Sequence, residues 1–138
     1  MSHPVSDSPR GLVRWIDTIA ERLEKRTARV LRKAGVDRTE WRVMTMLERG
    51  PATHFEVVAA LPVERGSSAP ADALGSLVLR QVVEITGRGY TLTPSGELLH
   101  DETLAAIAAL RRKLVVGITP EDWATTVATL ERIARNLR

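Results

Sequence analysis

The 138-residue sequence contains no cysteine. This absence excludes disulfide bonds, a thiol nucleophile, thiol-based redox sensing and cysteine-ligated zinc. The three histidines, His3, His54 and His100, are scattered along the chain and do not have the spacing of metal ligands. We therefore expect neither a bound metal nor another cofactor.

Long apolar runs are also missing. The run from Leu104 to Leu110 is far shorter than the ~20 residues that a membrane span needs. The segment from Met1 to Pro9 has no apolar stretch of the kind found in signal peptides. We therefore expect a cytoplasmic protein that makes no contact with a membrane.

No pattern of catalytic residues is present. The sequence has no nucleophile beside a base, no phosphate-binding glycine loop and no pair of carboxylates in an apolar setting. With 43% hydrophobic and 27% charged residues, the composition is that of a folded domain, and the length favours one domain over two. These features indicate a binding protein rather than an enzyme.

Apolar residues recur at helical spacing in several segments that begin at capping residues and end at glycine or proline. The segment 9–34 follows Ser8-Pro9 and precedes Gly35, which are typical helix start and stop signals. A helix of this length would extend ~39 Å. A domain this small cannot cover it fully, so part of it is expected to pack on a partner chain.

Three shorter helices and a hairpin follow. Capping boxes predict helices that start after Asp37 and Thr53, and Ser67 or Ser68 is expected to cap the next one. The stretch 82–92 has strand propensity around the turn Gly87-Arg88-Gly89. Two final helices start at Thr93-Pro94 and Thr119-Pro120.

This order predicts a mainly α fold with a short β-hairpin, a winged helix-turn-helix of six helices. We expect a single domain over residues 1–138, in which 36–100 form a DNA-reading lobe. The long N- and C-terminal helices, 9–34 and 94–138, are expected to serve dimerisation.

The helix after Ser67 has small and polar first turns, which suit entry into a DNA major groove. Arginines at its edges are candidates for phosphate contacts, and an arginine at the hairpin tip can reach the minor groove. Two interpretations remain open, since the serines also serve as caps and the tip arginine also suits a solvated turn. The candidate DNA-binding residues are Arg65, Ser67, Ser68, Asp72, Ser76, Arg80 and Arg88.

Three tryptophans, Trp15, Trp41 and Trp123, supply most of the aromatic surface. They can all be explained as core or dimer packing. Alternatively, Trp15 and Trp41 lie at the rim of an effector pocket in which Arg42 binds a carboxylate.

The charge distribution leaves a second function open. Residues 36–100 contain six basic and eight acidic residues, a net charge of −2, whereas the whole chain is +3. Because phosphate neutralisation dominates DNA affinity, such a lobe is a poor non-specific binder. The alternatives are a protein-interaction module, such as an antagonist of another regulator, and a small-molecule-binding dimer without DNA activity.

Three segments resemble the MarR family of transcription regulators. TEWRVMTML at 39–47 is similar to the family's second helix, and YTLTPSGELL at 90–99 to the exit from its wing. GITPEDW at 117–123 is similar to the start of its last dimerisation helix. The wing differs in one respect, because Thr86 stands where the family usually has an aspartate.

The resemblance implies a homodimer in which the first, fifth and sixth helices of two chains interlock. Each subunit would place its fourth helix in a major groove of double-stranded DNA and its wing in the adjacent minor groove. A two-fold dimer would read an inverted repeat with half-sites about 10 bp apart. The resemblance also implies a repressor that a small aromatic ligand releases.

Overall fold

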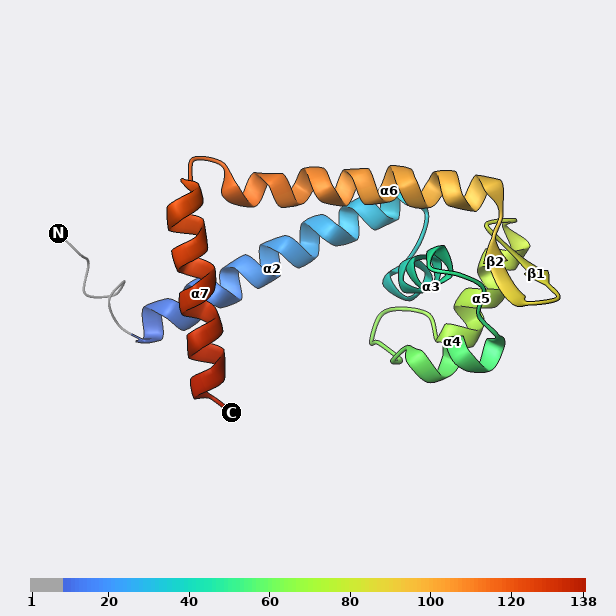
Figure 1. The fold of residues 1–138 in the computed structure, drawn as a ribbon, viewed down its shortest axis with the longest axis horizontal. Coiled ribbons are helices and arrows are strands. Elements are labelled where there is room, and N and C mark those ends of the chain that lie inside the picture. The colour runs from blue at the N-terminus through green and yellow to red at the C-terminus, as the bar shows by residue number, and fades with distance from the viewer. Residues whose placement is uncertain (1–8) are drawn as a thin grey trace. The chain divides into compact units, whose positions relative to one another are not determined.

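The computed structural model describes residues 9–138 (Figure 1). These residues form six α-helices, one short 3-10 helix and one β-hairpin, which confirms the predicted element order. The predicted cap at Ser8 lies outside the described residues. The elements are α2 (Pro9–Ala34), α3 (Arg38–Glu48), α4 (His54–Ala60), α5 (Pro70–Leu79), β1 (Val83–Thr86), β2 (Gly89–Leu92), α6 (Pro94–Arg112), η1 (Lys113–Val115) and α7 (Pro120–Asn136).

The chain divides into two compact units, with the boundary inside α6 after Ile107. The first unit contains α2 to α5, the hairpin and most of α6. The second contains the end of α6, η1 and α7. In neither unit is a helix of residues 9–138 both long and apolar enough to cross a membrane.

The hydrophobic core of the first unit lies where α3, α5 and the hairpin meet (Figure 1). Apolar side chains at helical spacing on α3 and α5 face each other there and lose contact with water, which is the main stabilising contribution to the lobe. Val57 brings α4 into the same core. The largest fully buried apolar side chains are Val43, Met44, Val57, Leu74, Leu77 and Val83.

Both predicted capping boxes are confirmed. The Asp37 carboxylate accepts from the Glu40 backbone N–H at 2.8 Å, and Glu40 accepts from the Asp37 N–H at 2.8 Å. Thr53 and Glu56 make the same reciprocal pair at 3.1 Å. These bonds satisfy backbone donors that the first turn of a helix leaves without partners.

The start of α5 corrects one prediction. The helix begins at Pro70, and its N-cap is Ala69, which makes no side-chain capping bond. The prediction that Ser67 or Ser68 caps it is therefore wrong. Pro70 fixes the backbone angle that the first helical residue needs, so α5 starts without a hydroxyl cap.

The hairpin pairs Val83 with Leu92 and Thr86 with Gly89, leaving Gly87 and Arg88 as the turn. The Thr86 hydroxyl donates to the Gly89 carbonyl at 3.1 Å and accepts from the Arg88 N–H at 3.2 Å. Thr86 thus braces the turn at the position where the family usually has aspartate.

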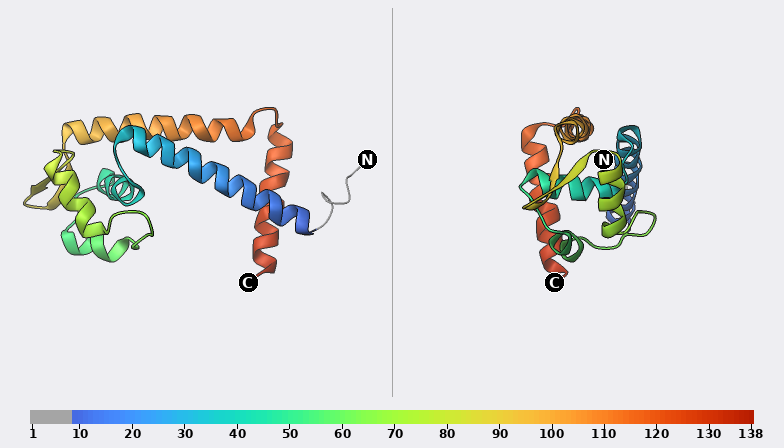
Figure 2. Two further views of the ribbon diagram at one scale, coloured as in Figure 1. Left: turned by 180° about the vertical axis from the view of Figure 1, so that it is seen from behind. Right: turned by 90° about the vertical axis from the view of Figure 1, so that its right-hand side faces the viewer.

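The base of the hairpin is fixed to the connection between α3 and α4. Ala52 and Tyr90 exchange backbone hydrogen bonds of 3.2 and 2.8 Å. Gly89 has a φ of +116°, and a Cβ there would overlap the Ala52 carbonyl. Glycine is needed here for both reasons. The hairpin is therefore held at the end of the lobe, next to α5 (Figure 2).

The sequence LTPSG at 92–96 forms the exit from the hairpin and the start of α6. The Thr93 hydroxyl donates to the Gln81 carbonyl at 2.6 Å and accepts from the Gly96 N–H at 3.0 Å, so Thr93 caps α6. A Cβ at Gly96 would overlap the Val82 carbonyl. Glycine at this position lets the start of α6 pack directly against the chain that enters the hairpin.

The second unit is built around α7. Thr119 caps the helix by accepting from the Asp122 N–H at 3.1 Å, and Pro120 follows it, as predicted. The preceding helix α6 ends at Arg112, and η1 continues to Val115. No residue of α7 is buried, although Trp123, Val127, Leu130 and Ile133 form an apolar stripe along it.

Candidate nucleic-acid interface

The outer face of α5 consists of small side chains. Ala73, Leu74 and Leu77 face the core, whereas Ala71 and Gly75 are exposed. A Cβ at Gly75 would meet nothing within 4 Å. The backbone of α5 can therefore approach another surface closely. Asp72 is exposed on the first turn, and no residue of α5 is basic.

The two serines before α5 bind the start of α3. The Ser67 hydroxyl accepts from the Thr39 N–H at 3.0 Å and lies 2.9 Å from the Thr39 hydroxyl. The Ser68 hydroxyl and N–H donate to Asp37 at 2.7 and 3.0 Å. The serines thus fix the loop before α5 onto α3, a role that sequence reasoning missed because the partners are about thirty residues apart.

These contacts also affect Asp37. Burial alone would raise the pKa of this carboxyl group. Hydrogen bonds from the Glu40 N–H, from Ser68 and from Ser67 outweigh burial and hold the pKa of Asp37 below its usual value. The junction between α3 and the loop before α5 therefore depends on an ionised aspartate.

Two predicted DNA-binding residues at the other end of α5 are engaged within the lobe. Arg80 contacts the buried Glu40 carboxylate at 2.7 Å and also donates to the Gly35 carbonyl. Ser76 donates to the same carboxylate at 3.0 Å. These bonds join the end of α5 to the junction of α2 and α3, so the Arg80 guanidinium already has two partners.

Other predicted contacts lie at exposed positions. Arg65 in the loop before α5 and Arg88 at the hairpin tip are exposed, and neither forms an ion pair with any residue of 9–138. Arg49, at the end of α3, is exposed and unpaired in the same sense. Arg65 and Arg88 are the predicted basic contacts that remain open to phosphate.

Three large apolar side chains of the same lobe are also exposed. Phe55 on α4 is 79% exposed, Leu79 at the end of α5 is 86% exposed, and Ile85 on β1 is 66% exposed. Sequence reasoning missed them, because their helical or strand spacing does not reveal which side chains find no cover. The exposed surface of α4, α5 and the hairpin therefore combines small and large apolar side chains with few cations.

The predicted effector residues are separated. Trp41 and Arg42 line a shallow hollow of about 490 Å³ between α3 and the end of α4, but Trp15 is not among its lining residues. Trp41 stacks on the ring of His100 at 4.7 Å, and Arg42 forms an ion pair with Glu64 at 2.8 Å. Trp15 is exposed on α2.

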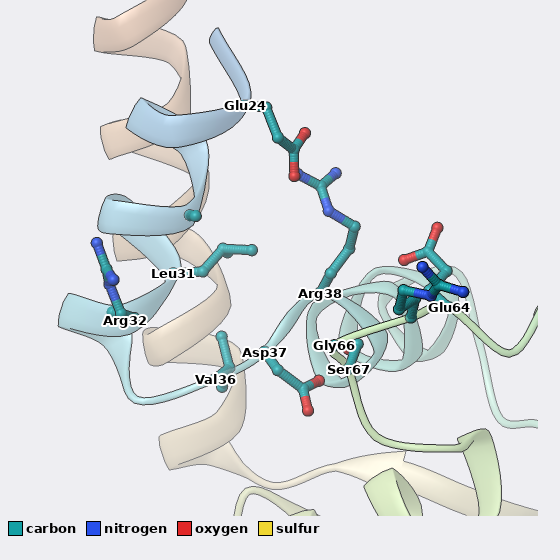
Figure 3. Close-up of a pocket in the computed structure, with 11 residues that line it drawn as sticks. Glu24, Leu31, Arg32, Val36, Asp37, Arg38, Glu64, Gly66 and Ser67 are labelled. Carbon is teal, nitrogen blue, oxygen red and sulfur yellow. The ribbon is translucent and has the colours of Figure 1, made fainter. Parts of the chain in front are cut away.

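A second hollow, of about 300 Å³, lies between the end of α2, the start of α3 and the loop before α5 (Figure 3). Arg38 reaches across its edge to Glu24 at 2.6 Å. Asp37 and Ser67 lie at its floor, and Arg65 also lines it. This hollow cannot be recognised in the sequence, because its walls come from three separate segments.

No family model and no curated protein matches the sequence. The structure, in contrast, is similar to many solved structures. The YusO protein of Bacillus subtilis has a TM-score of 0.75 at 17% identity over 94% of this chain and 99% of that one. A MarR family protein of Mycobacterium tuberculosis has a TM-score of 0.69 at 19% identity over 93% and 95%. MepR, a transcription regulator of a Staphylococcus aureus multidrug efflux pump, has a TM-score of 0.64 at 15% identity over 92% and 99%.

Three helices followed by a hairpin that is pinned beside the third define a winged helix-turn-helix protein. The similarity over nearly the whole chain makes this more specific. The chain has the fold of the MarR family regulators, with long helices before and after the winged lobe in the sequence.

Proposed function

We propose that this protein is a homodimeric DNA-binding transcription regulator of the cytoplasm, a repressor that reads an inverted repeat. The observation that carries the proposal is the exposed face of α5, which is narrow enough to enter a major groove and lies beside the pinned hairpin. A recognition helix needs this combination of close approach and a fixed flanking wing.

Base contacts in this proposal come from the first turns of α5. The Ala71 methyl group suits the methyl group of thymine, and the Asp72 carboxylate suits the amino group of cytosine. The first N–H groups of α5 have no side-chain cap, so a phosphate oxygen at this helix N-terminus would be stabilised. Ser67, Ser68 and Ser76 contribute mainly by holding α5 in place.

Phosphate contacts come from Arg65 and Arg88. Arg88 extends from the braced turn between two glycines, where it can enter the minor groove next to the site of α5. Arg80 contributes through its bond to Glu40, which fixes the end of α5. With so few cations, specificity depends more on base contacts than on charge.

The dimer in this proposal forms through the long helices. The stripe of Trp123, Val127, Leu130 and Ile133 on α7 is apolar, yet none of its residues is buried in one chain. A second copy of the chain would cover it. To read an inverted repeat, the two-fold dimer would need its two α5 helices one DNA turn apart.

The effector in this proposal is a small aromatic acid bound in the hollow of Trp41 and Arg42. Trp41 offers an aromatic wall, and the carboxylate of the ligand would replace Glu64 as the partner of Arg42. Trp15 lies outside this hollow, and we assign it to packing between subunits.

Selection from random DNA duplexes tests the regulator. We expect enrichment of an inverted repeat, with affinity that falls as salt rises. Arg88→Ala should weaken binding and lower the salt slope by about one unit, whereas Arg132→Ala on α7 should leave both unchanged. Enrichment of no palindrome would refute the proposal.

One observation favours a second candidate function, a protein-interaction module. Phe55, Leu79 and Ile85 expose apolar surface on a lobe whose net charge is −2, as interfaces with proteins often do. In that case the random duplexes yield no preferred sequence, and Leu79→Ser abolishes binding to a protein partner without changing the fold.

A further inference from the structure

His100, on the second turn of α6, is buried without a hydrogen-bond partner. Its residue is 4% exposed, and neither ring nitrogen has a partner among the described residues. One face of the ring stacks on Trp41. A buried polar atom without a partner costs free energy, so an unpaired imidazole in a fixed position calls for an explanation.

Two carboxylates stand in front of this imidazole. Glu48 is the last residue of α3, and Asp101 follows His100 on α6. Their oxygens each lie 3.9 Å from His100 Nδ1, and one ligand atom from each of the three residues lies within 4.8 Å of the others. A separation of 3.9 Å is too long for a hydrogen bond.

We propose that Glu48, His100 and Asp101 bind a divalent metal ion of the Zn²⁺ class. One imidazole nitrogen and two carboxylate oxygens form a ligand set that such ions accept, with water in the remaining position. Ligand atoms bound at ~2.0–2.1 Å around a tetrahedral ion stand about 3.3 Å apart. The two 3.9 Å separations therefore need to shorten by about 0.6 Å, and no separation among the three ligand atoms by more than about 1.5 Å.

The mobility of each ligand suits this adjustment. The Glu48 and Asp101 side chains are 46% and 70% exposed, so they can rotate towards an ion. His100 is held by burial and by the Trp41 ring, and supplies a fixed point. One rigid ligand and two adjustable ones make a site that an ion can enter from solvent.

The ion would join the end of α3 to the start of α6. Glu48 and His100 are about fifty residues apart in the sequence. His100 Nδ1 lies 3.9 Å from the Glu48 carboxylate, and the two side chains form no hydrogen bond. Bound metal would also place a charge within reach of Trp41, whose ring contacts that of His100. The site is independent of the proposed DNA-binding face.

Titration with Co²⁺ alone tests the proposal. The protein is the full chain without a tag, carrying His3→Gln and His54→Gln so that His100 is the sole imidazole. We expect one Co²⁺ per chain, a visible absorption band from a four- or five-coordinate ion, and quenching of Trp41 fluorescence. Zn²⁺ should compete with Co²⁺ and raise Tm.

Matched carboxylate variants identify the ligands. Glu48→Gln and Asp101→Asn should each weaken Co²⁺ binding at least about tenfold. Glu102→Gln, the exposed neighbour of Asp101, should bind as the parent protein does. Trp41→Phe should remove the quenching but keep the absorption band. Far-UV circular dichroism establishes that each variant is folded.

Two results would overturn the proposal. One is a dissociation constant for Co²⁺ above about 1 mM in the parent protein. The other is a folded Asp101→Asn or Glu48→Gln variant that binds Co²⁺ as tightly as Glu102→Gln.

Discussion

Helices α3 and α7 are both amphipathic and both begin at a side-chain cap, but the structure treats their apolar faces differently. On α3 the stripe meets α5 and the hairpin, and Val43, Met44 and Leu47 are buried. On α7 the equivalent stripe has no buried residue. One lobe of the chain therefore builds its own core, whereas the apolar face of α7 is left uncovered in a single chain, where the proposed dimer would bury it.

The largest expected effect comes from a charge on the α7 stripe. Leu130→Asp should weaken dimerisation by about 4 kcal/mol, because the buried charge is repeated in both subunits. Sedimentation should then show a monomer at micromolar concentration, and far-UV circular dichroism a folded lobe. Ala128→Asp, on the opposite face of α7, should remain a dimer. A parent protein that is itself a monomer would remove the basis of the comparison.

Adding a methyl group inside the lobe should change the free energy of unfolding but not dimerisation. Gly96→Ala forces a Cβ into the Val82 carbonyl and should lower the free energy of unfolding by about 2 kcal/mol. Urea unfolding measures the loss, and the mass of the folded protein should stay unchanged. A loss within about 0.5 kcal/mol would show that the start of α6 can shift away from the hairpin.

Lowering the pH should weaken the junction between α3 and the loop before α5. Because the folded pKa of Asp37 is lowered, its contribution is present above its unfolded pKa of about 4 and is lost as pH falls through the folded value. Asp37→Asn should cost about 1 kcal/mol at pH 7. It should also flatten the pH dependence of urea unfolding between about pH 5 and 2. Asp72→Asn, at an exposed site, should keep the slope of the parent.

The smallest effect on stability should have the opposite sign. Gly75→Ala adds a methyl group in open space and should stabilise the lobe by about 0.5–1 kcal/mol. If α5 enters a major groove, the same methyl group should weaken binding to the selected duplex. Unchanged affinity in a stabilised variant would show that this face of α5 does not approach the bases.

Most of the fold could be predicted from the sequence. Thr93-Pro94 predicted the start of α6, and the structure shows that the Thr93 hydroxyl caps this helix. The missing Cβ of Gly96 leaves room there for the Val82 carbonyl. The candidate site was harder. Arg80 stood out as a phosphate contact because its sequence neighbours suggested one, but its partner Glu40 lies forty residues away.

The sequence by itself determined most of the points where helices and strands begin and end, because caps, glycines, prolines and apolar spacing act within about four residues. The start of α5 is an exception, since Ser67 and Ser68 bind α3 and do not cap α5. Only the tertiary structure decided which side chains meet. It brought Ser67 to Thr39, Arg80 to Glu40, and His100 to Glu48. Such pairs depend on how whole elements pack, so three histidines scattered along the sequence do not reveal the proposed metal site.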